Sequence, residues 1–517
     1  MGNSTVRCNN GSFIGEDLDN IQIWRGIPYA KQPVGERRWK RPEPADDDNG
    51  TYEAIKPAHI PIVPVSILYE EILNDTIVMD EDCLTLNIFK AKASDSEKRP
   101  VMVWIHGGGF MIETISDPMY DLTNIALEQP DILFVTIEYR MGIMGFMNFE
   151  KVPGGENFPD AGVLGLLDQL EALRWIKKNI AAFGGDPDNI TIFGESAGSA
   201  SACFLPLMEG SEGLFNRIIG QSANVTCSDT KEHGVIVTEN LLLHAHRETM
   251  DELMLLSKDQ LWEILLKMIG TNKKEYLGGG NFPILDGVNL PEDRAVLYDM
   301  WGDEKRSKID MILGSNKDEI KYFMAENGGP EPFTETLKWT AKKDRSMLSD
   351  EEKAMMDKFM ETLEGEDDLE RFQQYANDLG FRAGNTLMAI NHAKAGGNTY
   401  MYYIRKPELT PEVGVMHATE LCYLFDHPYA GTEVDREDAG LEECEFRHVI
   451  KEMWTNFARC GDPSTEKYEW KQFSEEDRQT LVFDDTIGMQ KDILDRREDY
   501  MMSWSKRLGN GGGKMLC

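Results

Sequence analysis

The chain has 517 residues, 41% of them hydrophobic, which is an ordinary content for a globular protein with a large buried core. Its 90 acidic residues outnumber the 54 basic ones and give a formal net charge of −36. Such a field repels polyphosphates, which excludes nucleic acid as a partner. No apolar run approaches the roughly 18 residues that a membrane-spanning helix needs, so no membrane insertion is expected.

No repeat, low-complexity tract or long linker divides the chain. We therefore expect one domain over residues 1–508, followed by a flexible, glycine-rich tail at 509–517. The N-terminal segment is polar and lacks the basic and apolar regions of a signal peptide. The eight cysteines are scattered without a Cys-x-x-Cys pair, which argues against a metal or dithiol redox site. Free thiols in a reducing cytoplasm are the expectation that follows.

Short β-rich runs alternate along the chain with turn residues and helical patterns. Between 165 and 180 the apolar residues recur on one face of a helix. Strands are expected at 101–105, 132–139, 190–193, 217–221, 309–314 and 399–404. Strands that alternate with helices predict a mostly parallel sheet flanked by helices. The charged, amphipathic stretches 229–305 and 321–395 are expected to be helical insertions above that sheet.

A glycine-rich segment follows the first of these strands, with the sequence His106-Gly-Gly-Gly-Phe. Successive glycines let backbone N–H groups converge on a substrate oxygen without a Cβ in the way. No Gly-Lys-Ser/Thr follows, which excludes a phosphate-binding loop. The segment predicts an oxyanion hole.

A second motif, Gly194-Glu-Ser-Ala-Gly, lies between the strand at 190–193 and a helix that begins at Ala197. A sharp strand-to-helix turn needs residues without bulk on either side of the serine, hence the two glycines. The turn lifts the Ser196 hydroxyl clear of the sheet and places it at a helix N-terminus, where developing negative charge is favoured. Ser196 is therefore the predicted nucleophile.

The base must be a histidine downstream of an acid, because the chain order that goes with this turn is nucleophile, acid, base. Four histidines lie late enough: His392, His417, His427 and His448. His417 follows a loop after the strand at 399–404 and has the most favourable position. For the acid, Asp318 and Glu319 both follow the strand at 309–314, and spacing does not choose between them.

Together these motifs resemble the type-B carboxylesterase and cholinesterase family, over about residues 23–504. The segments that carry the resemblance include Trp24-Arg-Gly-Ile-Pro-Tyr-Ala, Glu81-Asp-Cys-Leu-Thr-Leu-Asn, Trp104-Ile-His-Gly-Gly-Gly-Phe, Phe193-Gly-Glu-Ser-Ala-Gly-Ser, Gly414-Val-Met-His and Trp454-Thr-Asn-Phe-Ala-Arg. The resemblance implies an α/β-hydrolase fold, with a large, mostly parallel sheet and helical insertions over the active site. It also implies a serine carboxylic-ester hydrolase that uses no metal and no cofactor.

Carried over position by position, the resemblance implies that Ser196 is the nucleophile, Glu319 the acid and His417 the base. It further implies two groups of supporting residues. These are oxyanion-hole N–H groups on Gly108, Gly109 and Ala197, and a buried polar cluster behind the histidine made of Glu195, Ser222 and Glu420. The pairs Arg38–Glu81 and Arg140–Asp168 resemble structural ion pairs of the family.

The chain departs from the family pattern at several positions, and two of these departures bear on its expected compartment and substrates. Glu138 stands where an Asn is usual. No cysteine lies between Cys8 and Cys83, so the first disulfide of secreted relatives cannot form, which favours the intracellular, bacterial-type branch, para-nitrobenzyl esterase-like. No Trp lies between Trp39 and Cys83 to stack a quaternary ammonium, so hydrolysis of choline esters is not expected.

The expected reaction is hydrolysis of small or medium soluble esters through an acyl-enzyme on Ser196, by a monomer or homodimer. An esterase for aromatic acids such as ferulate is the main alternative, because it would differ only in pocket residues. A long-chain lipase would need an apolar lid, which this acidic chain argues against. A non-catalytic binding member of the fold typically lacks the nucleophile, whereas this chain has all three triad positions.

Overall fold

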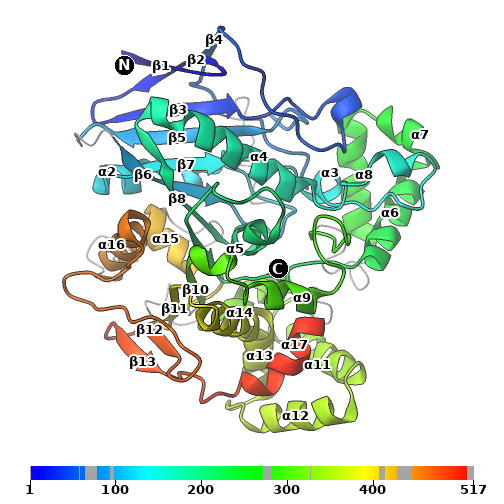
Figure 1. Cartoon of the computed structure of the whole chain (residues 1–517). Helices are drawn as coiled ribbons and strands as arrows, with labels where there is room; N and C mark the ends of the chain where they lie inside the picture. The colour runs from blue at the N-terminus through cyan, green and yellow to red at the C-terminus, as the bar shows by residue number, and fades with distance from the viewer. Residues whose placement is uncertain are drawn as a thin grey trace.

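The computed structural model describes residues 2–57, 59–64, 78–93, 98–271, 282–326, 328–406, 414–427 and 445–508. Its strands are β1 Gly2–Cys8, β2 Gly11–Asp17, β3 Ile21–Pro28, β4 Thr51–Glu53, β5 Thr85–Ala91, β6 Arg99–Ile105, β7 Leu133–Ile137, β8 Gly185–Glu195, β9 Arg217–Gln221, β10 Asp310–Asn316, β11 Thr399–Ile404, β12 Gln479–Phe483 and β13 Gly488–Lys491. They form one 13-stranded sheet in the order β1-β2-β3-β5-β7-β6-β8-β9-β10-β11-β12-β13, and β4 pairs with β2 (Figure 1).

The centre of the sheet, from β7 through β6, β8, β9, β10 and β11 to β12, is entirely parallel. Antiparallel pairs occur only towards the two ends of the described sheet. A parallel sheet is buried on both faces, and its strands are therefore continuous apolar runs. This confirms the predicted mostly parallel sheet.

The helices are α2 Thr123–Glu128, α3 Gly142–Gly145, α4 Leu164–Asn179, α5 Ala197–Phe204, α6 Lys231–Ala245, α7 Met250–Met254, α8 Lys258–Thr271, α9 Arg294–Met300, α10 Tyr322–Glu326, α11 Pro330–Ser346, α12 Asp350–Glu361, α13 Asp368–Asn377, α14 Ala383–Lys394, α15 Thr419–Phe425, α16 Glu445–Cys460 and α17 Asp499–Leu508. Side chains alternate between the two faces of a strand. In β6, Val101, Val103 and Ile105 therefore join the core that contains α4 and α5. Met102 and Trp104 join the core that contains α15 and α16.

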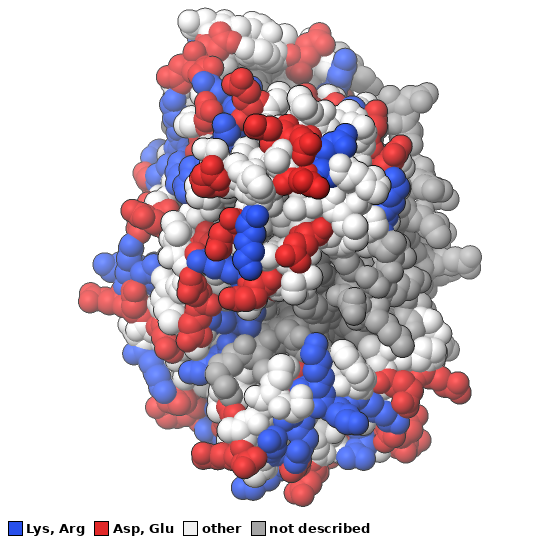
Figure 2. All heavy atoms as spheres, turned by 90° about the vertical axis from the view of Figure 1, so that its right-hand side faces the viewer, with Lys and Arg blue, Asp and Glu red and all other residues white. Residues whose placement is uncertain are grey.

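Two groups of helices lie beside the sheet, on the right in Figure 1: α6, α7 and α8 above, and α11, α12, α13 and α17 below. Helix α6 contacts α8, α11 contacts α13, and α12 contacts α17. The stretch 229–305 contains α6 to α9, and 321–395 contains α10 to α14. Figure 2 shows this side of the molecule, where acidic and basic side chains are interspersed instead of forming a patch of one sign.

The sequence pattern predicts no strand before residue 101 and none after residue 404, whereas the structure has β1 to β5 and β12 to β13 there. Strand β1 explains why. It is an edge strand whose residues are alternately exposed and half-buried, so its sequence is polar and carries no apolar periodicity. The pattern of apolar residues identifies the buried centre of a sheet more readily than its margins.

Among the described residues, no helix combines the length and apolarity that crossing a bilayer requires. Cys8, Cys83, Cys203, Cys422 and Cys460 are free thiols, as expected. Cys227 is disulfide-bonded, however, so the expectation of free thiols throughout the chain was wrong. Pairing between cysteines that are scattered along a chain leaves no spacing pattern to detect. The tail expected at 509–517 lies outside the described residues.

Candidate active site

Ser196 lies between the end of β8 and the start of α5, with φ 54° and ψ −123°. A positive φ is rare and strained for a residue with a side chain, and it persists only where the surroundings enforce it. The glycines on either side permit this turn. A Cβ on Gly198 would lie 1.9 Å from the carbonyl oxygen of Ile105, and one on Gly194 would lie 2.5 Å from the backbone of Gly198. The turn places Ser196 at the N-terminus of α5, as predicted.

The candidate base and acid meet although they are far apart in the sequence. His417 lies just before α15, and its Nδ1 is 2.7 Å from Oε2 of Glu319, which lies in a short turn after β10. Both side chains are buried. The other oxygen of Glu319 accepts a hydrogen bond of 2.6 Å from the backbone N–H of Asn316. The carboxylate is therefore held on both sides, in a position to orient the imidazole.

Asp318, the alternative acid, has a different role. Its Oδ2 accepts the backbone N–H of Val415 at 3.2 Å, and its Oδ1 lies 3.5 Å from Nζ of Lys321. It therefore fixes the loop that carries His417 and does not contact the imidazole itself. His392 also lies apart from this site, because its Nδ1 is hydrogen-bonded to Thr399 beside the start of β11.

The Nε2 atom of His417 faces Glu195, at 3.2 Å from its Oε1. Within the described part of the chain Ser196 Oγ forms no hydrogen bond, so the expected contact between serine and histidine is not made in this structure. The rings of Phe323 and Phe381 pack beside the imidazole, with centroids 5.6 and 5.3 Å away. Glu195 is the residue directly before Ser196, so the imidazole faces the segment that carries the serine.

The glycine-rich segment lies against the nucleophile. A Cβ on Gly107 would be 3.2 Å from the Cβ of Ser196. Gly108 and Gly109 both have positive φ, 80° and 60°. In the described residues the backbone N–H groups of Gly108, Gly109 and Ala197 donate no hydrogen bond, so these three donors remain available to a substrate oxygen.

Buried carboxyl groups surround the imidazole. Burial raises the pKa of Glu195 well above its usual range, and the neighbouring carboxyls of Glu420, Glu113 and Glu319 raise it further. Burial and Glu319 also raise the pKa of Glu420, which accepts hydrogen bonds from the amide side chains of Gln221 and Asn316. Both shifts favour the protonated form.

The structure brings together some members of the expected polar cluster but not all. The carboxyl of Glu420 is close enough to Glu195 to raise the pKa of Glu195. The Ser222 hydroxyl is fully buried and has no hydrogen-bond partner among the described residues, so it does not join the two carboxyls directly. Asn316, which sequence reasoning missed, bonds both Glu319 and Glu420. Asn316 lies at the carboxyl end of β10, the end of a parallel strand at which functional sites are found, and this position could have identified it as a site residue.

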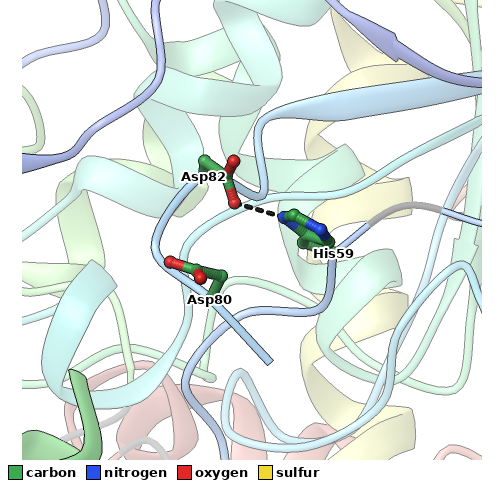
Figure 3. Close-up of side chains that lie close together, drawn as sticks. All are labelled: His59, Asp80 and Asp82. Carbon is green, nitrogen blue, oxygen red and sulfur yellow. Dashed lines mark hydrogen bonds and ion pairs between the residues drawn. The ribbon is translucent and has the colours of Figure 1, made fainter. Parts of the chain in front are cut away.

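One group of metal-ligand type residues stands out in the described residues: His59, Asp80 and Asp82, whose candidate ligand atoms lie within 4.8 Å of one another (Figure 3). His59 Nδ1 is hydrogen-bonded to Asp82. Nζ of Lys258 lies 2.6 Å from Oδ2 of Asp80. Because an ammonium group already neutralises one carboxylate and the imidazole engages the other, we interpret the group as an ion-pair cluster.

The two expected structural ion pairs are both formed and buried. Arg38 binds Glu81 through two hydrogen bonds of 2.5 and 2.6 Å. Arg140 binds Asp168 through Nε at 2.8 Å and Nη2 at 2.6 Å. Paired, bidentate geometry of this kind is what a buried arginine requires. Neither pair touches Ser196 or His417, which agrees with a role in the scaffold.

Known proteins resemble this chain over almost its whole length. The sequence profile described as "Carboxylesterase family" matches residues 2–501. The para-nitrobenzyl esterase of Bacillus subtilis (strain 168) is 31% identical over 506 residues, covering 95% of this chain and 97% of that protein. Carboxylesterase 1D of Mus musculus is 28% identical, covering 86% and 82%. Among solved structures, the carboxylesterase EST55 of Geobacillus stearothermophilus matches with a TM-score of 0.81 and 32% identity, covering 96% of this chain and 99% of that one.

Proposed function

The chain belongs to the carboxylesterase family and is a serine carboxylic-ester hydrolase of the α/β-hydrolase fold, and from that premise we propose that Ser196 is its nucleophile, Glu319 its acid and His417 its base. Two observations support the assignment: Ser196 lies in a strained strand-to-helix turn, and His417 is buried with its Nδ1 held by the Glu319 carboxylate. This combination is the requirement for generating a reactive hydroxyl at neutral pH.

The reaction proceeds in two steps. In the first, His417 Nε2 takes the proton of the Ser196 hydroxyl as its oxygen attacks the ester carbonyl carbon, and the same imidazolium then protonates the leaving alcohol. In the second, water attacks the acyl-enzyme with His417 again as base, and the acid is released. Glu319 keeps the Nδ1 proton in place and stabilises the imidazolium.

The negative oxygen of each tetrahedral intermediate lies among the N–H groups of Gly108, Gly109 and Ala197. One such donor typically stabilises the transition state by about 3 kcal/mol, because it is fixed in advance and shielded from water. The positive φ of the two glycines supports this assignment, since it turns successive N–H groups towards one point. Removing any of these donors would require a change in the backbone.

We propose small or medium soluble esters as substrates, including the para-nitrobenzyl esters that name the Bacillus subtilis relative. The aromatic-acid alternative has no supporting observation. We further propose a cytoplasmic monomer or homodimer, folded as one domain over residues 1–508 with insertions at 229–305 and 321–395. The free thiols support this compartment, whereas the disulfide at Cys227 opposes it. Thiol titration of the enzyme from its natural source, together with its elution volume, tests both points.

The decisive experiment is hydrolysis of p-nitrophenyl acetate, butyrate and palmitate before and after treatment with an organophosphate. The parent enzyme turns over the short esters, and one covalent adduct forms on Ser196. Ser196→Ala abolishes both results. Ser199→Ala is the matched control, since the Ser199 hydroxyl lies on the same helix and donates to the carbonyl of Ala223. Turnover or labelling that survives in Ser196→Ala would disprove the assignment.

A further inference from the structure

One buried carboxylate ties together both ends of the segment that contains the oxyanion glycines. Oε1 of Glu138 lies 2.9 Å from Nε2 of His106. Oε2 of Glu138 accepts hydrogen bonds from the hydroxyl of Thr114 at 2.5 Å and from the backbone N–H of Ile115 at 3.0 Å. All four residues are buried. Gly107, Gly108 and Gly109 lie between these anchored ends.

Glu138 is itself rigidly held. It follows directly after β7, its N–H donates to the carbonyl of Thr85 at 3.0 Å, and its own carbonyl accepts the hydroxyl of Tyr29 at 2.6 Å. The next residue, Tyr139, stacks on the His106 ring at 4.5 Å and donates to the His106 carbonyl at 2.9 Å. The glycine segment is therefore fastened to the central sheet through its side-chain partners as well as through the chain.

A carboxylate suits this position because it offers two oxygens to three donors. The Asn that is usual here would be one methylene shorter and would have a single acceptor oxygen. In the present structure the acceptor role of both oxygens requires that His106 carries its proton on Nε2, since that nitrogen faces Glu138. A buried donor left without an acceptor destabilises the fold, so the segment strongly prefers this one arrangement.

We propose that Glu138 is a positioning residue for ester hydrolysis: its carboxylate fixes the segment between His106 and Ile115 so that the N–H groups of Gly108 and Gly109 point at the substrate oxyanion. The inference rests on the proposed oxyanion hole. Loss of this positioning should lower kcat and leave KM almost unchanged. Donors that are displaced by a fraction of an ångström stabilise the transition state less, while binding of the neutral ester is almost unaffected.

The test compares Glu138→Ala, Glu138→Gln and Thr114→Val with the parent, using p-nitrophenyl acetate. In Glu138→Ala we expect kcat to fall about 100-fold, the effect of losing one oxyanion donor, with KM within about threefold. Glu138→Gln keeps one acceptor for Ile115 and turns its NH2 to His106, whose other tautomer can accept it. The kcat of this variant should therefore be at least about tenfold higher than that of Glu138→Ala. Thr114→Val removes one bond of three and should cost less than Glu138→Ala.

Glu498→Gln is the matched control, because Glu498 is equally buried and accepts a hydrogen bond of 2.7 Å from Arg478, outside the site. It should lower the melting temperature without changing kcat. The proposal is overturned if Glu138→Ala keeps the parental kcat, or if kcat falls in Glu498→Gln as much as in Glu138→Gln. If Glu138→Ala does not fold, Glu138→Gln and Thr114→Val decide. If instead the proposed function is wrong, turnover survives in Ser196→Ala, which is a different result from the two above.

Discussion

Replacing Glu319 by Gln isolates the charge of the candidate acid while keeping its size. In the structure, Oε1 of Glu319 accepts the backbone N–H of Asn316 and Oε2 faces Nδ1 of His417. Because the N–H of Asn316 can only donate, the carbonyl oxygen of the new amide must face it, and the NH2 group must face His417. The NH2 group also donates, so Nδ1 loses its proton and Nε2 carries one instead. The imidazole is then unable to accept the Ser196 proton.

An inverted tautomer of this kind lowers kcat by about 10⁴, which corresponds to about 5.5 kcal/mol of transition-state stabilisation. The assay is steady-state hydrolysis of p-nitrophenyl acetate, with the rate of organophosphate labelling as a second readout. Asp318→Asn is the control and should cost less than about tenfold, because Asp318 only holds the loop at Val415. A Glu319→Gln variant within tenfold of the parent, or an equal loss in Asp318→Asn, would refute the reasoning.

Three further predictions concern stability. Burial raises the pKa of Asp344 from 3.8 to about 6, so stability is lost as pH rises from about 4 through 6, by about 3 kcal/mol in total. Asp344→Asn, which keeps an acceptor for Tyr375, should gain melting temperature over the parent between pH 5 and 8, and a difference that is flat with pH would contradict this. Burial lowers the pKa of His392 from 6.5 to about 4, so its contribution is present above pH 6.5 and is lost by about 3 kcal/mol as pH falls through 4. In His392→Asn, melting curves recorded from pH 7 to 4.5 should lack this part of the slope. Gly198→Ala should yield no folded enzyme by circular dichroism, since its Cβ would lie 1.9 Å from the carbonyl oxygen of Ile105; a folded, active variant would show that the turn can relax.

How far the sequence predicts this site depends on how local each part of it is. The turn at Ser196 needs glycines at fixed neighbouring positions, so a short motif defines it. No short motif identifies the acid, because Asp318 and Glu319 both follow β10. Only the backbone conformation of the turn after β10 determines which way each side chain points. Asp318 is turned to the loop at Val415 and Glu319 to His417. Sequence spacing alone does not contain that information.

The orientation of side chains in the site could not be predicted from the sequence for the same reason. His417 Nε2 faces Glu195, and the direction of the ring depends on packing by Phe323 and Phe381, which come from separate segments of the chain. Glu138 was noticed as a departure from the family pattern, but its three hydrogen bonds depend on the path of the loop from His106 onwards. Contacts between distant segments require the fold itself.

Three glutamates around one histidine raise the question of how the site avoids an excess of negative charge. Burial raises the pKa of both Glu195 and Glu420; the Glu420 carboxyl raises that of Glu195 further, and the Glu319 carboxyl that of Glu420. Glu319 instead faces two donors, the N–H of Asn316 and Nδ1 of His417. Similar side chains therefore have different surroundings, and those of Glu195 and Glu420 are shifted towards the neutral form. The Glu319 carboxyl group that faces Nδ1 is therefore placed to stabilise the positive charge that the imidazolium acquires during the reaction.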